Sequence, residues 1–254
     1  MRLDAALVKR GLAESRSEAS RLIDDGHVTV SGAFADKSSR LVAPDEPINV
    51  VVEKKFVSRG GEKLSHALDS FGIEVINRSV MDAGVSTGGF TDCVLQRGAR
   101  RVFAVDVGRN QLHERIKKDP RVDWRDGVNV REIEPDVLPF PCSLLVADLS
   151  FISLTKVLPA LMAVMGPEEG FAQPAMVLLV KPQFEAGRVE VSRGKGVITD
   201  PVIHAEAIRT VQDCVEGHGG IVAGLVESPI KGAEGNTEFL MFVECPTSFV
   251  GCES

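Results

Sequence analysis

The chain has 254 residues, enough to bury a substantial core and to form one large domain or two unequal ones. Hydrophobic residues make up 44% of it, but no apolar run approaches the ~20 residues that cross a bilayer, so we expect no membrane partner. The 5 cysteines and 5 histidines are scattered without disulfide-type or metal-ligand spacing, which argues against a metal and favours a reducing, cytoplasmic location.

The net charge of -7, taken alone, argues against a nucleic-acid ligand. The charges are unevenly distributed, however. Residues 1–59 hold ten Lys and Arg against nine Asp and Glu, so nearly all of the excess acid lies in the rest of the chain. The first part of the chain can therefore still carry a basic face.

The first 54 residues predict a small α+β domain. Apolar residues spaced by three and four predict a short helix over residues 3–11, and the capping box Ser15-Arg-Ser-Glu18 predicts a second helix that runs to Gly26. Three β-like stretches follow, at residues 27–30, 33–35 and 48–52.

This order of elements resembles the S4 RNA-binding module of a ribosomal protein and several RNA-modifying enzymes. The resemblance rests on the helix pair with spaced arginines and on the stretch Gly26-His-Val-Thr-Val-Ser-Gly32. It implies that cations on the helix face bind RNA phosphates, although a solvated helix face explains each one as well. The candidate RNA-binding residues are Arg2, Lys9, Arg10, Arg16, Arg21, Lys37 and, in the segment that follows, Arg59.

A charged, glycine-containing segment, residues 55–61, predicts a linker between this domain and a second one over residues 62–246. A helix is expected from Glu62 to Gly72, because its apolar residues have helical spacing. This helix carries Lys63 near its N-terminus. A lysine there is unfavourable for the helix dipole, so its position indicates a role other than helix stability.

The second domain continues with a strand-loop-helix unit. The apolar pair Val80-Met81 leads into Asp82-Ala-Gly84-Val-Ser86-Thr87-Gly88-Gly89-Phe90, and a helix follows. A dinucleotide loop reads G-x-G-x-x-G, and Ser86 stands at its second glycine, so an NAD-dependent oxidoreductase is disfavoured. A nucleoside ligand without phosphates fits better, and S-adenosylmethionine is such a ligand. The alternative is that the glycines only permit a tight turn.

The next two strands end at polar residues. Residues 101–105 lead to Asp106, where a carboxylate would accept hydrogen bonds from ribose hydroxyls, unless it only caps a helix over residues 111–118. Residues 121–124 lead to the place where an adenine ring is expected. The candidate cofactor-binding residues are Asp82, Gly84, Ser86, Thr87, Gly88, Gly89, Phe90, Asp106, Asp126, Asn129 and Asp148.

The rest of the chain alternates strands and helices, which predicts a Rossmann-like doubly wound α/β sheet closed by two consecutive strands. A glycine-rich, charged stretch at residues 187–199 predicts a mobile loop near the site. The remaining strands are expected at residues 143–147, 175–180, 221–226 and 238–243.

Four charged residues are expected at one edge of this sheet. Asp148 and Lys181 follow the ends of two buried strands. If the last strand is antiparallel, Glu238 begins it at the same edge. Lys63 would be delivered there by the preceding helix, so the sequence predicts a cluster of two lysines and two carboxylates beside the glycine loop.

Six stretches carry a further resemblance, at residues 63, 82–91, 105–108, 147–153, 180–185 and 235–238. In order and spacing they resemble the TlyA family, in which an S4 module is fused to an FtsJ-like methyltransferase. The resemblance implies S-adenosylmethionine-dependent 2'-O-methylation of cytidine ribose in ribosomal RNA, of the 16S or 23S type or both. It also implies that Lys63, Asp148, Lys181 and Glu238 form the catalytic tetrad.

The implied partners are ribosomal RNA or ribosomal subunits, with no metal and no membrane. The main alternative is a non-catalytic rRNA-binding or ribosome-assembly factor with a methyltransferase-like domain. It predicts RNA binding without methyl transfer. Members of the family have also been called haemolysins, but no segment of this sequence is predicted to insert into a membrane.

Overall fold

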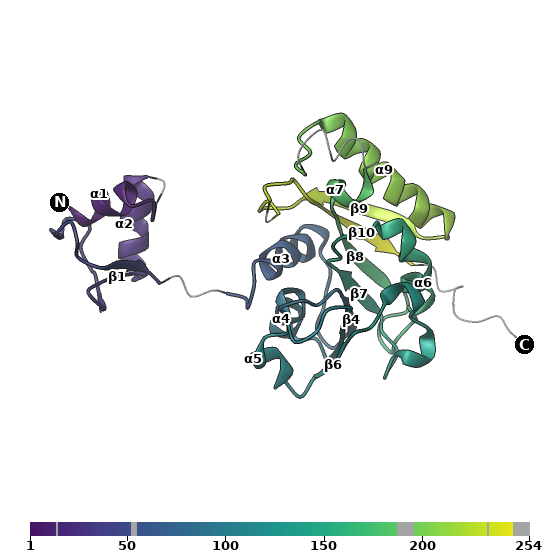
Figure 1. Cartoon of the computed structure of the whole chain (residues 1–254). Coiled ribbons are helices and arrows are strands. Elements are labelled where there is room, and N and C mark those ends of the chain that lie inside the picture. Colours follow the sequence, from purple (N-terminus) through teal and green to yellow (C-terminus); the bar gives the residue numbers. More distant parts are fainter. Residues whose placement is uncertain (14, 52–54, 187–195, 233, 246–254) are drawn as a thin grey trace, which may run out of the picture. The chain divides into compact units, whose positions relative to one another are not determined.

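The computed structural model describes residues 1–13, 15–51, 55–186, 196–232 and 234–245. The chain divides into two compact units, Met1–Lys55 and Phe56–Ser254 (Figure 1). Most of the expected mobile loop at 187–199, and the end of the first predicted domain at 52–54, lie outside the described residues. The segment predicted as a linker belongs largely to the second unit, because Phe56 is buried in its core and helix α3 begins already at Gly60.

The first unit has the predicted helix pair and three short strands. Helices α1 (Leu3–Lys9) and α2 (Arg16–Asp24) pack on a sheet in which β1 (Val28–Val30) lies between β2 (Ala33–Phe34) and β3 (Ile48–Val50), antiparallel to both. Ser15 caps α2 as predicted, since its hydroxyl accepts a hydrogen bond from the backbone N–H of Glu18 at 3.2 Å. The unit has a small apolar core of its own.

The second unit is a seven-stranded sheet covered by helices on both faces, as predicted. Its strand order is β6-β5-β4-β7-β8-β10-β9, and β10 is antiparallel to both of its neighbours. The strands are β4 (Ser79–Ala83), β5 (Arg101–Asp106), β6 (Val122–Asp126), β7 (Leu144–Ala147), β8 (Ala175–Val180), β9 (Ile221–Glu227) and β10 (Phe239–Glu244).

Two helical layers cover this sheet, one on each face (Figure 1). Helices α3 (Gly60–Phe71) and α4 (Gly89–Gln96) pack on one face, while α6 (Leu158–Ala163) and α9 (Pro201–Gly217) pack on the other. Strand β8 is buried at every position because its alternate side chains enter the two opposite layers. The shorter helical elements are α5 (Glu114–Lys117), α7 (Pro182–Glu185), η1 (Val130–Glu132), η2 (Pro135–Val137) and η3 (Leu154–Lys156).

The region after β5 differs from the prediction. The helix expected over residues 111–118 is only α5, which His113 caps by accepting a hydrogen bond from the N–H of Arg115. Asn110 has a left-handed φ of 59°, which is incompatible with a helix that starts there. Strand β6 in turn extends to Asp126, which pairs with Asp106 in the parallel ladder.

Candidate active site

The glycine loop joins β4 to α4 by a close approach of two backbones. Gly84 has a φ of +87°, and a Cβ atom there would lie 2.6 Å from the backbone oxygen of Asp148. Only glycine therefore allows the end of β4 to touch the segment that follows β7. Ser86 also has a left-handed φ, of 46°, and it lines the cavity described next.

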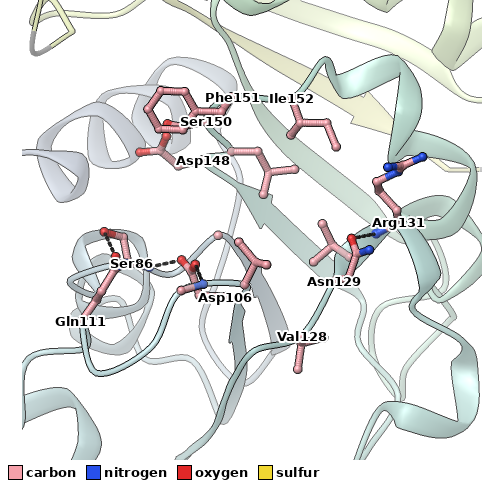
Figure 2. Close-up of a pocket in the computed structure, with 15 residues that line it drawn as sticks. Ser86, Asp106, Gln111, Val128, Asn129, Arg131, Asp148, Ser150, Phe151 and Ile152 are labelled. Carbon is pink, nitrogen blue, oxygen red and sulfur yellow. Dashed lines mark hydrogen bonds between the residues drawn. The ribbon is translucent and has the colours of Figure 1, made fainter.

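A cavity of about 560 Å³ opens at the carboxyl ends of the parallel strands (Figure 2). One wall is polar and holds Ser86, Asp106 and Gln111. Apolar side chains, including Val128 and Ile152, line it as well. This combination of apolar walls with a few fixed polar groups is typical of small-molecule sites.

The Asp106 carboxylate is fixed by the backbone of the loops around it. One oxygen accepts a hydrogen bond from the N–H of Ser86 at 2.8 Å, and the other accepts one from the N–H of Gly108 at 2.7 Å. Each carboxylate oxygen can accept a further bond. Asp106 thus presents open acceptor positions to a hydroxyl-bearing ligand in the cavity, as the sequence predicts for a ribose.

Eight of the predicted cofactor residues line this cavity or a smaller one of about 110 Å³ that shares Gly84, Ser86 and Asp148 with it. They are Gly84, Ser86, Asp106, Asn129 and Asp148 in the larger cavity, and Thr87, Gly89 and Phe90 in the smaller one.

Asp82, Gly88 and Asp126 line neither cavity, and their predicted contact with a cofactor stays a prediction. Asp82 is fully buried; one carboxylate oxygen accepts a hydrogen bond from Thr91 Oγ1 at 2.6 Å, and the other has no partner. Burial raises the pKa of Asp82 to about 7. A Cβ on Gly88 would meet Leu112, and Asp126 accepts a bond from the backbone of the loop before α5. All three residues therefore contact the protein around the glycine loop and not the cavities.

Sequence reasoning missed three polar residues of the cavity wall, Gln111, Arg131 and Ser150. Gln111 is the first residue of the helix that the sequence predicts, but in the structure it precedes α5, and its amide oxygen accepts a hydrogen bond from Ser86 Oγ at 3.2 Å. Ser150 lies within a motif that the sequence did single out, at residues 147–153. No sequence signal marks Arg131.

The four predicted charged residues form two ion pairs. Lys63 Nζ contacts Glu238 Oε2, and Lys181 Nζ lies 2.6 Å from Asp148 Oδ1. Lys181 Nζ also donates a hydrogen bond to Ser150 Oγ at 2.8 Å. Lys63, Lys181 and Glu238 are exposed by only 8%, 7% and 3%, and lysines are almost never buried so deeply unless they are paired.

The register of the sheet brings the two pairs together. Phe239 of β10 lies opposite Val180 of β8 in an antiparallel ladder, so the next positions, Glu238 and Lys181, face each other across the two strands. Directly opposed residues of this kind have Cβ atoms about 5 Å apart on the same face. All four charged side chains therefore gather at the edge of the sheet where Asp148 borders both cavities.

The loop before β10 packs against the Glu238 side chain. A Cβ on Gly232 would collide with Glu238 Oε1, so the glycine lets the carboxylate lie against the backbone. The Asn236 side chain, only 1% exposed, accepts a hydrogen bond from the N–H of Ile198 and donates one to the oxygen of Gly196, both at 2.9 Å. These two bonds tie the loop before β10 to residues 196–198.

The predicted RNA-binding residues are all exposed, but their side chains are engaged to different degrees. Arg2 and Arg16 both bond to the buried Asp4, at 3.0 and 2.8 Å, and these bonds lower the pKa of Asp4. The guanidinium of Arg10 donates to the backbone oxygens of Ala43, Pro44 and Glu46.

The other candidates are freer. Arg59 donates one hydrogen bond, to the oxygen of Lys231 at 2.7 Å. Lys9, Arg21 and Lys37 form no ion pair with another described residue. Among the described residues, moreover, no helix is long and apolar enough to cross a bilayer, and no three His, Cys, Asp or Glu side chains are grouped as metal ligands would be.

Comparison with known proteins places this geometry in context. A family model described as FtsJ-like methyltransferase matches residues 56–244, and one described as S4 domain matches residues 1–48. The 16S/23S rRNA (cytidine-2'-O)-methyltransferase TlyA of Mycobacterium tuberculosis is 42% identical over 97% of this chain and 90% of its own length. Hemolysin A of Brachyspira hyodysenteriae is 41% identical over 94% of this chain and 98% of its own. A crystal structure from Lactococcus lactis, of a protein assigned as a hemolysin, has a TM-score of 0.72 at 41% identity and covers 77% of this chain and 91% of that one.

Proposed function

The chain belongs to the TlyA family, in which an S4 domain precedes an FtsJ-like methyltransferase domain, and from that premise we propose that it methylates the 2'-hydroxyl of a cytidine in ribosomal RNA. The methyl donor is S-adenosylmethionine. The observation that carries the proposal is the meeting of the buried Lys63–Glu238 pair with the Lys181–Asp148 pair, in which only the lysine is buried, beside a nucleoside-sized cavity. A ribosomal substrate also supports the predicted cytoplasmic location.

The cavity fits the proposed cofactor in size and in chemistry. The open acceptor positions of Asp106 suit the two ribose hydroxyls, and the apolar side chains near Asn129 suit an adenine ring. The Gly84 turn leaves room beside Asp148, where a Cβ would otherwise intrude. When bound, S-adenosylmethionine supplies an electrophilic methyl group on a positively charged sulfur.

The residues at the sheet edge then act on the substrate hydroxyl. Lys181 Nζ acts as general base once it has released its own proton to solvent: the neutral amine then accepts the proton of the 2'-hydroxyl, which makes the oxygen nucleophilic. Asp148 orients that amine through its 2.6 Å contact and faces both cavities. Lys63 and Glu238 complete the charge network, so that the cluster is nearly neutral and its desolvation costs less.

An exposed aromatic ring supports a nucleic-acid substrate. Phe151 lines the cavity with 93% of its surface exposed, next to Ser150 and hence to Lys181. A nucleotide whose base is splayed out of the stack can bring its ribose close to this lysine. An unstacked base would gain a stacking partner in Phe151, and aromatic side chains commonly serve this purpose in RNA recognition.

The direct test measures methyl transfer from labelled S-adenosylmethionine. Purified protein is incubated with rRNA that lacks the modification, free or assembled in each subunit, and the modified nucleotide is mapped. We expect a single class of 2'-O-methylated cytidine. Lys181→Ala should abolish incorporation and leave cofactor affinity within about threefold, whereas Lys118→Ala, at an exposed lysine after α5, should change neither. RNA binding without incorporation by the wild-type protein would instead favour the non-catalytic assembly factor.

A further inference from the structure

Two segments that follow neighbouring parallel strands are joined by a series of contacts. Residues 148–154 follow β7, and residues 181–185 follow β8. At the near end, Lys181 contacts Asp148 and Ser150. Further along, the rings of Phe151 and Phe184 lie 5.4 Å apart. The two segments thus run side by side from the base of the proposed active site outward.

The far end of this arrangement is closed by one carboxylate. Glu185 Oε2 accepts a hydrogen bond from Ser153 Oγ at 2.5 Å, and Oε1 accepts one from the backbone N–H of Leu154 at 2.8 Å. Leu154 begins η3, whose first N–H groups have no partner within the helix. Both oxygens of Glu185 therefore bind the same short segment, and burial raises the pKa of this carboxyl despite those bonds.

The backbone between the two ends is strained. Phe151 has a left-handed φ of 65°, which is an outlier for a bulky side chain. Its side chain is 93% exposed, so burial of the ring does not compensate. The flanking serines hold this conformation through the contacts of Ser150 with Lys181 and of Ser153 with Glu185, in addition to the contact between the Phe151 and Phe184 rings. Figure 2 shows Asp148, Ser150 and Phe151 together on one wall of the cavity, apart from Asp106.

We propose that Glu185 is a positioning residue for methyl transfer: it fixes residues 148–154 so that Ser150 and Asp148 orient Lys181 and Phe151 presents its ring. The inference rests on the proposed function and adds to it a residue outside the tetrad. Without the Glu185 carboxylate, the chain around Phe151 can relax to a right-handed conformation. Ser150 then moves away from Lys181, and the amine is no longer held in line with the substrate hydroxyl. A displacement of about 1 Å at a reacting group can lower a rate about 100-fold.

The test compares Glu185→Ala with Glu185→Gln. An amide in place of the carboxylate still accepts from Leu154 and can donate to Ser153, whereas alanine does neither. We expect Glu185→Ala to lower kcat about 10- to 100-fold and Glu185→Gln to stay within about threefold of wild type. Rates are divided by the concentration of S-adenosylhomocysteine-binding sites, so that misfolded protein does not count. Glu206→Ala, at an exposed position of α9, is the matched control and should match wild type.

A second readout does not depend on activity. Hydrogen exchange in peptides covering residues 149–156 should rise at least about tenfold in Glu185→Ala, but not in Glu185→Gln or Glu206→Ala. Ser153→Ala, a milder change for use if Glu185→Ala does not fold, should give a smaller rise and a smaller loss of rate. Unchanged exchange in this segment, or a normal kcat per binding site, would overturn the inference. If the variants show the expected differences in hydrogen exchange but the wild-type protein transfers no methyl group, the proposed function is refuted and the structural role of Glu185 is not.

Discussion

Charged side chains are buried at both ends of the parallel strands, which form two opposite edges of the seven-stranded sheet: the amino-terminal edge, where the strands begin, and the carboxyl-terminal edge, where they end. The two edges differ in how many hydrogen bonds these charged groups form within the protein. At the amino-terminal edge, the Glu168 carboxylate accepts bonds from Ser79 N at 2.8 Å, Ser79 Oγ at 2.6 Å and Ser143 Oγ at 2.8 Å, and it pairs with Arg100. Burial raises the pKa of Glu168, but these donors outweigh it and hold the pKa below its usual value. Every acceptor position is engaged inside the protein.

At the carboxyl-terminal edge, the charges are paired but not saturated. The Asp148 side chain is 26% exposed and borders both cavities, against 4% exposure for Glu168. Asp106 likewise keeps free acceptor positions toward the cavity. The difference indicates that a fully bonded charge cluster stabilises the fold, while a cluster with open positions is available to a ligand.

The largest effect is expected at the Lys63–Glu238 pair. Lys63→Ala leaves Glu238 buried without its partner, which should lower the free energy of unfolding by about 3–5 kcal/mol. The double variant Lys63→Met with Glu238→Leu removes both charges and should recover most of this loss in urea denaturation. It should not recover methyl transfer. A double variant that regains turnover would mean that the pair is only structural, like the Glu168 cluster.

The next effect tests Asp82, which lies behind the glycine loop with one oxygen unbonded. Because its folded pKa of about 7 exceeds the unfolded value, the folded state binds an extra proton between these two pH values. Its contribution to stability is therefore full at low pH and lost as the pH rises through about 7. As the pH rises from 4 to 8, the free energy of unfolding of Asp82→Asn should increase by up to about 4 kcal/mol relative to that of the wild type, since each pKa unit is worth about 1.4 kcal/mol. Urea titrations at several pH values measure this difference, and Asp213→Asn, exposed on α9, is the control.

A smaller loss is expected at the saturated edge. Glu168→Ala leaves the N–H of Ser79 and the hydroxyl of Ser143 without their acceptor, which should cost about 3 kcal/mol of stability. Turnover per cofactor-binding site should stay unchanged, because no bond of Glu168 reaches the cavities. A fall in turnover per site that exceeds twofold would contradict the proposed division between the two edges.

The sequence predicted the fold and the charge cluster for physical reasons that can be named. Continuous apolar strands alternating with helices leave few alternatives to a doubly wound sheet. The convergence of Lys181 and Glu238 follows from strand direction alone, since an antiparallel last strand begins where its neighbour ends. Lys63 could be singled out because its charge opposes the helix dipole. These inferences depend on local rules and on topology, both of which the sequence encodes directly.

The parts that could not be predicted depend on tertiary approach. The sequence does not reveal that the Asp82 side chain points into the helical layer that contains α4, where Thr91 donates a hydrogen bond to it. All five residues of β4 are buried, so no alternation of polar and apolar residues reveals which face each side chain enters. Gln111 and Ser150 lie in the cavity wall next to the left-handed residues Asn110 and Phe151. Neither is a glycine, and of the two only asparagine is enriched in this conformation.

The smallest expected effect extends the comparison to the first unit, where cations are also either engaged or open. Arg10 donates to three backbone oxygens, whereas Arg21 is exposed and forms no ion pair within the described part of the chain. In full-length protein, Arg21→Ala should reduce the salt dependence of rRNA binding by about one phosphate contact, a slope change near 0.9. Arg10→Ala should leave that slope unchanged and lower stability by about 1 kcal/mol, because its hydrogen bonds hold the loop before β3. If the two variants change the slope equally, the hydrogen bonds that a cation forms within the protein do not decide whether it can bind RNA. The difference between fully bonded and open charged groups, seen at the two edges of the sheet, would then not apply to the first unit.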